Sequence, residues 1–190
     1  MHKNPAICLF GGTFDPIHEG HIHIAKAAVS SYNIDKVIFL PCAQSPHKLN
    51  QESAAEEHRM NMCELATADL PWAEVNDFDI TTPSPSYSWK TAEYFRHQFP
   101  SATLYWLLGA DQWDVLHLWR RIDYLAEMIH FIVCTRGTQT LKNQPYTSLN
   151  IQTDHPASST AIRNAIAKHG NPQWLDKRVL NFIYKMRLYC

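Results

Sequence analysis

The chain has 190 residues, of which 45% are hydrophobic and 18% charged, values typical of one globular domain that buries its own core without disulfides or metal. Its 17 basic and 18 acidic residues give a formal net charge of −1, which excludes an overall positive field for holding a nucleic acid. No apolar run approaches the roughly 20 residues that span a bilayer, and residues 1–5 lack the apolar core of a signal peptide, so we expect a cytoplasmic protein with no membrane partner.

The first predicted strand, 6–10, leads into the stretch Phe10-Gly11-Gly12-Thr13-Phe14-Asp15-Pro16-Ile17-His18-Glu19-Gly20-His21. A helical pattern follows over 18–31, so this stretch is the first strand-to-helix turn of an α/β sheet. Its adjacent glycines allow a close backbone approach to a ligand or a positive φ, and the helix N-terminus favours anions. His18 and His21 share one helix face and can donate hydrogen bonds to phosphoryl oxygens. The turn therefore predicts a phosphate-binding site.

The rest of the chain alternates apolar strands with helices. Continuous apolar runs at 36–41, 103–108 and 130–135 predict parallel strands covered on both faces, with shorter strands at 73–75 and 148–152. Helices are expected at 53–68, at 89–99, in two short pieces over 113–128, at 161–169 and at 172–188. This order predicts an α/β fold, a doubly wound and mostly parallel Rossmann-like sheet. We expect one domain, with a core over 1–152 and a small helical C-terminal part over 153–190.

Local signals mark three helix starts and one loop. Ser53 with Glu56 has the spacing of a capping box, Ser88 precedes another helical pattern, and Ser158-Ser159-Thr160 precedes a third. The segment 81–88 contains two prolines, which exclude a helix or a central strand there. It is therefore predicted to be a rigid loop at a strand end, where binding sites tend to lie.

Polar residues follow the three long predicted strands. In an open parallel sheet, ligands bind beyond the carboxyl ends of the strands, so these residues are expected to meet. They are His47 and Lys48 after 36–41, Gly109 and Asp111 after 103–108, and Arg136 after 130–135.

Four of the candidate residues allow two interpretations. Lys48 is either a solvated loop residue or, at a strand end beside a proline and a histidine, a phosphate contact, which we favour. Asp111 is a helix N-cap, an acceptor for ribose hydroxyls, or both. Arg163 is a surface residue or, one turn into a helix that begins with Ser-Ser-Thr, part of a second phosphate clamp. Trp119 has helical spacing, which on its own favours the core.

The sequence gives no support to a metal centre of the protein's own. The five cysteines are scattered without a Cys-x-x-Cys pair, so we expect thiols rather than a zinc site or disulfides. The remaining histidines share no metal-ligand spacing and are expected to be solvated or capping: His23, His58, His97, His117, His130, His155 and His169.

These motifs, taken in order, resemble those of the nucleotidyltransferase superfamily with the His-x-Gly-His motif, and most of all those of bacterial nicotinate-mononucleotide adenylyltransferases. The matching segments are Gly11 to His21, Pro46-His47-Lys48, Pro85-Ser86-Tyr87-Ser88, Gly109-Ala110-Asp111 with Leu116 and Trp119, and Ser158-Ser159-Thr160 with Arg163. The departures are small: Ser88 stands where the family has threonine, Ala157 replaces an aliphatic residue, and Gly137 follows Arg136 without the common proline.

The resemblance implies that the chain transfers the adenylyl group of ATP to nicotinate mononucleotide, forming deamido-NAD and pyrophosphate in NAD biosynthesis. It implies catalytic roles for His18, His21, Lys48 and Arg163, with Mg²⁺ carried mainly by the ATP phosphates. It implies stacking of the nicotinate ring on Trp119. The expected substrate-binding residues are Gly11, Gly12, Thr13, Phe14, His47, Ser86, Tyr87, Ser88, Gly109, Asp111, Trp119, Arg136, Ser158, Ser159 and Thr160.

Two alternatives remain. Another adenylyltransferase of the same fold would use nicotinamide mononucleotide or phosphopantetheine as the acceptor, against which the loop 85–88 and Trp119 argue. A non-catalytic nucleotide sensor on the same scaffold would be expected to lack a motif histidine or Arg163, and both are retained. The sequence is compatible with a homo-oligomer and leaves the oligomeric state open.

Overall fold

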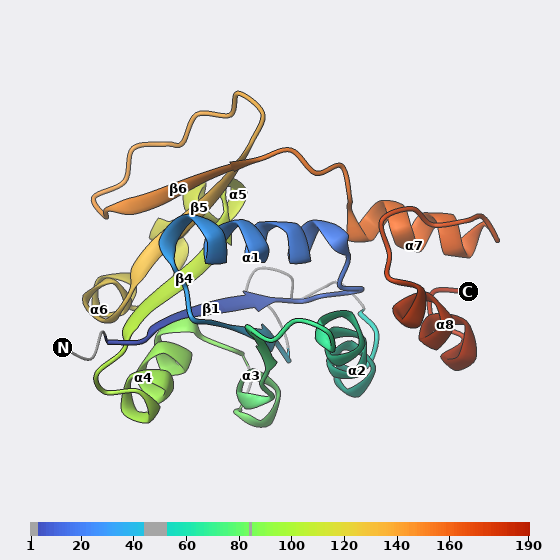
Figure 1. The fold of residues 1–190 in the computed structure, drawn as a ribbon, viewed down its shortest axis with the longest axis horizontal. Helices are drawn as coiled ribbons and strands as arrows, with labels where there is room; N and C mark the ends of the chain where they lie inside the picture. The colour runs from blue at the N-terminus through green and yellow to red at the C-terminus, as the bar shows by residue number, and fades with distance from the viewer. Residues whose placement is uncertain (1–3, 44–52, 84) are drawn as a thin grey trace.

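The computed structural model describes residues 4–43, 53–83 and 85–190 (Figure 1). The strands are β1 (Ala6–Gly12), β2 (Lys36–Pro41), β3 (Ala73–Val75), β4 (Thr103–Gly109), β5 (His130–Arg136) and β6 (Ser148–Thr153). The helices are α1 (Glu19–Tyr32), α2 (Glu56–Thr67), α3 (Phe78–Thr81), α4 (Ser88–Gln98), α5 (Ala110–Asp114), η1 (Leu116–Leu118), α6 (Ile122–Met128), α7 (Ser159–Ala167) and α8 (Lys177–Met186). Within these ranges no helix is both long and apolar enough to cross a membrane.

The six strands form one parallel sheet in the order β3-β2-β1-β4-β5-β6. After β3, at one edge, the chain returns across the sheet to β4 on the other side of β1. The order therefore reverses between β1 and β4, which is the point where open α/β sheets bind ligands. The predicted α/β, Rossmann-like fold is confirmed, including the short strand β3 and the edge strand β6.

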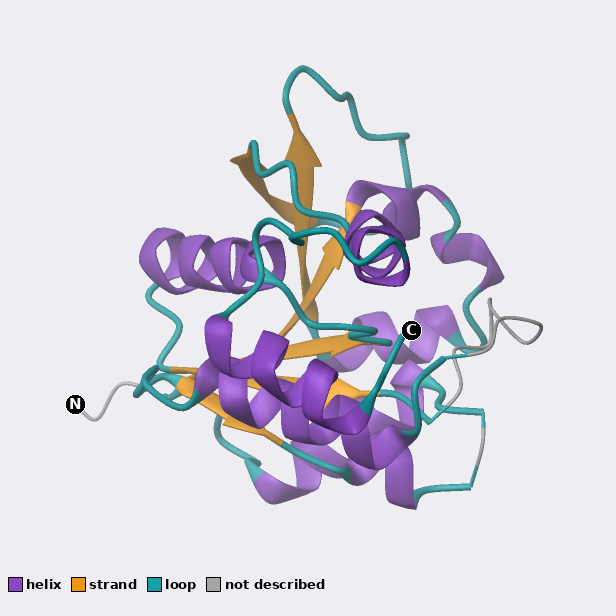
Figure 2. Cartoon of the chain, turned by 90° about the vertical axis from the view of Figure 1, so that its right-hand side faces the viewer, coloured by secondary structure: helices purple, strands orange, loops and turns teal. Residues whose placement is uncertain are grey.

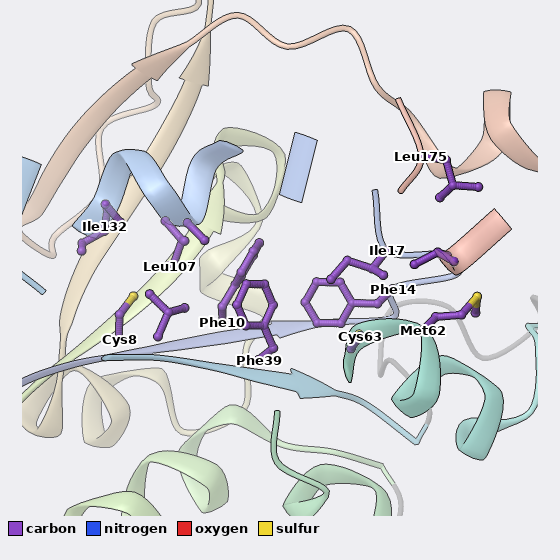
Figure 3. Packing of buried hydrophobic residues seen from close by; sticks show 14 of the residues in the cluster. Cys8, Phe10, Phe14, Ile17, Phe39, Met62, Cys63, Leu107, Ile132 and Leu175 are labelled. Carbon is purple, nitrogen blue, oxygen red and sulfur yellow. The ribbon is translucent and has the colours of Figure 1, made fainter. Parts of the chain in front are cut away.

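The sheet is covered on both faces because successive side chains of a strand point to opposite sides. Cys8 and Phe10 of β1 belong to a buried cluster with residues of α1 and α2, whereas Ile7 and Leu9 pack with residues of α4, α5 and α6. Figure 1 shows α1 on one side of the sheet and α4 on the other. Figure 3 shows the first cluster continuing from the strands to Met62 of α2.

The C-terminal helices α7 and α8 lie beyond the carboxyl ends of the strands (Figure 1), and the view from that end shows helices in front of the sheet (Figure 2). Ile162, Val179 and Ile183 belong to the same buried cluster as Cys8. Met186, the last residue of α8, is 40% exposed. The shared core supports our proposal that 1–152 and 153–190 are two parts of one domain.

Two side-chain caps that the sequence predicts at helix starts are absent from the structure. The capping box of Ser53 and Glu56 is absent, since α2 begins after Ala55 and has no side-chain cap. Ser88 is the first residue of α4 rather than its cap. At the start of α2, the carbonyl of Ala54 accepts a hydrogen bond from the buried Arg59. A polar backbone group near the helix end is thus satisfied by a long side chain of the same helix.

Candidate active site

Two cavities lie side by side at the carboxyl ends of β1 and β4. The polar cavity, of about 590 Å³, is lined by His18, Arg136, His155, Ser158, Ser159, Thr160 and Arg163 among others. The aromatic cavity, of about 320 Å³, is lined by Tyr87, Trp106 and Trp119 together with Gly11, Gly12, Ser86 and Ser88 among others. Thr13, His21, Gly109 and Asp111 line both cavities and form their shared wall.

The glycine turn gains its shape from close packing rather than from unusual glycine dihedrals. Gly12 is the last residue of β1, and the positive φ belongs to Phe14, at 50°. A Cβ atom on Gly12 would lie 2.9 Å from the tip of the Phe14 ring, so a larger residue would displace that ring. The glycine thus lets the chain fold Phe14 back under the end of β1.

Phe14 was expected among the substrate-binding residues, but its ring lines neither cavity. It is 2% exposed and packs against Phe10 and Phe39, as Figure 3 shows. Its ring also meets the His21 ring edge-on, with centroids 5.1 Å apart. The turn directs the Phe14 side chain into the core. From the core, its ring packs against the His21 imidazole.

The two motif histidines form a stacked pair at the start of α1. Their ring centroids are 3.7 Å apart and the rings are inclined by 20°. The backbone N–H of His18, the N-cap residue, donates to Nδ1 of His21 over 3.2 Å. A neutral His21 with an acceptor at Nδ1 carries its proton on Nε2, so that nitrogen is a hydrogen-bond donor.

The glycine between the histidines is required by this stack. A Cβ atom on Gly20 would lie 3.0 Å from Nδ1 of His18 and 3.2 Å from the Cβ of Ala157. Any side chain at this position would push the imidazole away or separate α1 from the segment before α7. The spacing His-x-Gly-His thus serves the ring packing as well as the helix periodicity.

Both imidazoles are neutral at pH 7. Burial lowers the pKa of His18 to about 4, with further repulsion from His155 and Arg136. Burial also holds the pKa of His21 well below its usual value, and His18 and Arg136 lower it further. The pair therefore contributes neutral N–H donors to the cavities and no permanent charge.

Helix α7 is tied to the turn after β1 by side chains that the Ser-Ser-Thr motif supplies. Nη1 of Arg163 donates to the carbonyl of Asp15 over 2.6 Å and lies 3.7 Å from the Asp15 carboxylate. The Ser159 hydroxyl donates to the carbonyl of Pro16 over 3.0 Å. Ser158 is the N-cap residue, but its side chain makes no capping bond. These contacts close the polar cavity by joining distant segments of the chain. Arg163 and Asp15, for example, are 148 residues apart.

A buried arginine, missed by the sequence analysis, braces the same turn. Arg59 is fully buried, and its guanidinium donates to the carbonyls of Thr13, Ala43 and Ala54 over 2.8, 3.2 and 2.9 Å. Arg59 lies three residues before Met62 and four before Cys63, both of which are buried, so the three side chains share the inner face of α2. This helical spacing was the signal in the sequence that could have identified Arg59. The contact fixes the backbone of Thr13, which lines both cavities.

The aromatic cavity is framed by rings. The Trp119 ring meets the Trp106 ring edge-on at 6.0 Å, and the buried Nε1 of Trp119 has no hydrogen-bond partner among the described residues. Trp119, whose spacing alone favours the core and whose family resemblance implies stacking on a ligand, lines this cavity. Asp79 also lines this cavity, accepts a hydrogen bond from the Thr91 hydroxyl, and has its pKa raised to about 6 by burial.

The structure brings together most of the expected site residues. His47 and Lys48 lie outside the described residues, and Phe14 lies in the core. Asp111 does not cap α5, because that helix begins at Ala110 after Gly109 as N-cap. Its carboxylate lies on the shared wall, where one oxygen accepts a hydrogen bond from the Gln112 side chain over 3.2 Å. His155, expected to be solvated or capping, lines the polar cavity and packs beside Trp174.

Comparison with known proteins agrees with this geometry. A family model described as cytidylyltransferase-like matches residues 9–165. A protein of Neisseria meningitidis serogroup C, named "Probable nicotinate-nucleotide adenylyltransferase", is 36% identical over 96% of this chain and 98% of its own length. A protein of the same name from Endomicrobium trichonymphae is 34% identical, with 100% of both chains covered.

Among solved structures, the chain resembles the Plasmodium falciparum nicotinic acid mononucleotide adenylyltransferase complexed with NaAD. The TM-score is 0.74 and the match covers 99% of this chain and 98% of the other. At 21% sequence identity this likeness concerns the fold. The family model and the two relatives together establish that the chain belongs to the nicotinate-nucleotide adenylyltransferase family within the cytidylyltransferase-like group.

Proposed function

We propose that the chain transfers the adenylyl group of ATP to the 5′-phosphate of nicotinate mononucleotide, giving deamido-NAD and pyrophosphate. The observation that carries the proposal is the shared wall of the two cavities, made by Thr13, His21, Gly109 and Asp111. Two nucleotides in adjacent cavities would meet at this wall with their phosphates. The names of the relatives at 34% and 36% identity agree with that reaction.

The polar cavity is the better fit for ATP. Arg136 and Arg163 supply cationic groups there, and α7 begins at its edge with Ser159 and Thr160. Cations and a helix N-terminus both favour a polyphosphate chain. The aromatic cavity offers Trp119 and other flat rings, which favour a pyridine ring over a flexible chain.

The reaction needs alignment and charge stabilisation more than a base. The acceptor phosphate monoester has a second pKa near 6 and is largely dianionic at pH 7, so its oxygen can attack the α-phosphorus directly. The bond from the α-phosphorus to the bridging oxygen then breaks, and pyrophosphate leaves with the electron pair. Neutral N–H donors such as Nε2 of His21 stabilise the charge that develops on the phosphoryl oxygens.

Mg²⁺ is proposed to enter with ATP. No group of three or more His, Cys, Asp or Glu side chains within the described ranges could hold a metal ion, so the chain offers no dense ligand set of its own there. Mg²⁺ binds readily to phosphate oxygens and water, and when bound it neutralises charge on the triphosphate. Asp111 on the shared wall is the carboxylate placed to accept a hydrogen bond from a water molecule or a ribose hydroxyl. Lys48 stays a predicted phosphate contact.

The proposal is tested with purified protein, ATP and Mg²⁺, using nicotinate mononucleotide, nicotinamide mononucleotide or phosphopantetheine as acceptor. Pyrophosphate release is measured together with the mass of the dinucleotide product. We expect deamido-NAD as the main product, with ATP binding detected by calorimetry. Turnover with phosphopantetheine alone would favour the alternative adenylyltransferase, and ATP binding without turnover of any acceptor would favour a nucleotide sensor.

A further inference from the structure

The aromatic cavity has an unusual balance of charge for a site that receives an acidic ring. Two carboxylates, Asp79 and Asp111, line it. His21 is neutral, because burial holds its pKa well below the usual value. Among the described residues that line this cavity, Arg120 is the one cationic side chain. A negatively charged ligand group in this cavity would therefore be repelled by two carboxylates and attracted by one guanidinium.

Arg120 is placed so that its charge is available to a ligand. It is exposed, and its guanidinium carbon lies 5.3 Å from the centre of the Tyr87 ring. Within the described ranges it makes no ion pair. A guanidinium attracted to a ring in this way uses none of its N–H groups in a conventional hydrogen bond, so they stay available, and their fork fits the two oxygens of a carboxylate.

We propose that the Arg120 guanidinium binds the carboxylate of the pyridine ring and makes this chain select the acid over the amide form of the acceptor. The inference rests on the proposed function and adds a specificity-determining residue to it. A neutral carboxamide enters the same cavity without needing a cation, and it gains little from Arg120. A carboxylate gains a charge-assisted, bidentate interaction that offsets the repulsion from Asp79 and Asp111.

The next residue provides a matched control. The Arg121 guanidinium lies 4.4 Å from the centre of the Trp89 ring and 4.2 Å from that of Tyr124, and Arg121 lines neither cavity. Arg120→Gln and Arg121→Gln therefore remove the same charge from adjacent positions. Only the first substitution removes it from the cavity.

The experiment measures kcat and KM for nicotinate mononucleotide and nicotinamide mononucleotide at saturating ATP and Mg²⁺, with the wild-type protein and the two variants. We expect Arg120→Gln to lower kcat/KM for the acid acceptor about fivefold to tenfold, the size of a partly solvated charge-assisted hydrogen bond, through KM rather than kcat. The value for the amide acceptor should stay within about twofold, whereas Arg121→Gln should change neither. Arg120→Lys, which keeps the charge but loses the fork, should restore part of the effect.

Three outcomes would overturn the inference. In the first, Arg120→Gln lowers kcat/KM equally for both acceptors, which would assign Arg120 to the phosphate or ribose. In the second, Arg120→Gln and Arg121→Gln lower kcat/KM equally, and in the third, the wild-type protein does not distinguish the acid from the amide acceptor. Thermal unfolding of each variant identifies any general loss of structure, which would lower kcat for both acceptors. A wild-type protein that turns over neither mononucleotide would refute the proposed function itself, a result distinct from each of these.

Discussion

The polar and the aromatic cavity share a wall but are built by different means. The polar cavity depends on directional bonds between distant segments, above all those of Arg59 to Thr13 and of Arg163 to Asp15. The aromatic cavity depends on ring packing, such as Trp106 against Trp119, and has an exposed arginine beside it. A phosphate chain needs donors at fixed positions, whereas a flat ring needs flat surfaces. The difference indicates which substitutions should affect reaction rate and which should affect binding.

The two cavities also contain buried titratable groups that respond to pH in opposite directions. His18 in the polar cavity is stabilised in its neutral, unprotonated form, and Asp79 in the aromatic cavity in its neutral, protonated form. In both cases burial is the largest cause, because it penalises the charged form. A fall in pH therefore opposes one group and favours the other.

The largest expected effect is on the chemical step and should be confined to the polar cavity and the shared wall. His18→Ala and His21→Ala should each lower the single-turnover rate of adenylyl transfer on the order of 10²-fold, because each removes a donor aimed at developing charge. Rapid quenching with both substrates saturating measures this rate. If both variants kept near wild-type rates, the role of the stacked pair would be wrong.

The next effect is on the pH dependence of the free energy of unfolding, to which the two cavities contribute with opposite signs. His18 binds fewer protons when folded between pH 6.5 and about 4, so its stabilising contribution, present above pH 6.5, is lost as pH falls. Between pH 3.8 and about 6, Asp79 binds more protons in the folded than in the unfolded state. Its contribution to the free energy of unfolding therefore increases as the pH falls through this window. Each contribution is about 3 kcal/mol over its whole window.

Urea unfolding at pH 4.5 and pH 7 tests this pair of signs. Relative to the wild-type protein, His18→Gln should make stability fall less on acidification, and Asp79→Asn should make it fall more. The asparagine can still accept the hydrogen bond from Thr91, which limits unrelated losses. Parallel pH profiles for the two variants would contradict the assignment.

A third effect concerns ATP binding. Arg163→Gln removes a cation from the polar cavity and the bond to the Asp15 carbonyl, so the dissociation constant for ATP should rise about tenfold, with little change for the acceptor. Calorimetry with a non-hydrolysable ATP analogue measures it. Lys168→Gln, which removes an exposed charge just after the same helix, is the control and should leave ATP affinity unchanged.

The smallest effect concerns the acceptor ring. Trp119→Leu should raise KM for nicotinate mononucleotide about fivefold to tenfold through loss of stacking, and leave the KM for ATP unchanged. Trp89→Leu alters a tryptophan that lines neither cavity and should change neither constant. A rise in the KM for ATP with Trp119→Leu would mean that the two cavities are not separate binding sites.

Several parts of the site could be predicted because they depend on local pattern. Strand ends of a parallel sheet share one edge, so Gly109 and Arg136 could be expected near the glycine turn without knowledge of the packing. The inward turn of Phe14 could not, since that direction depends on the space left between Phe10 and Phe39. Arg59 shares the helical spacing of the inner face of α2, but arginine is usually exposed, so only the structure reveals its burial and its three carbonyl partners.

The sequence by itself determined the order of the strands and of the longer helices, the parallel sheet and the family motifs, though not the short helix α3, because these follow from the spacing of apolar residues and from residues adjacent in the chain. Only the tertiary structure decided that the motifs divide between two cavities, that the paired imidazoles are neutral, and that Arg120 faces one cavity while Arg121 does not. Burial, and hence charge state and access to a ligand, depends on contacts between segments far apart in the chain. Such contacts leave no regular spacing in the sequence.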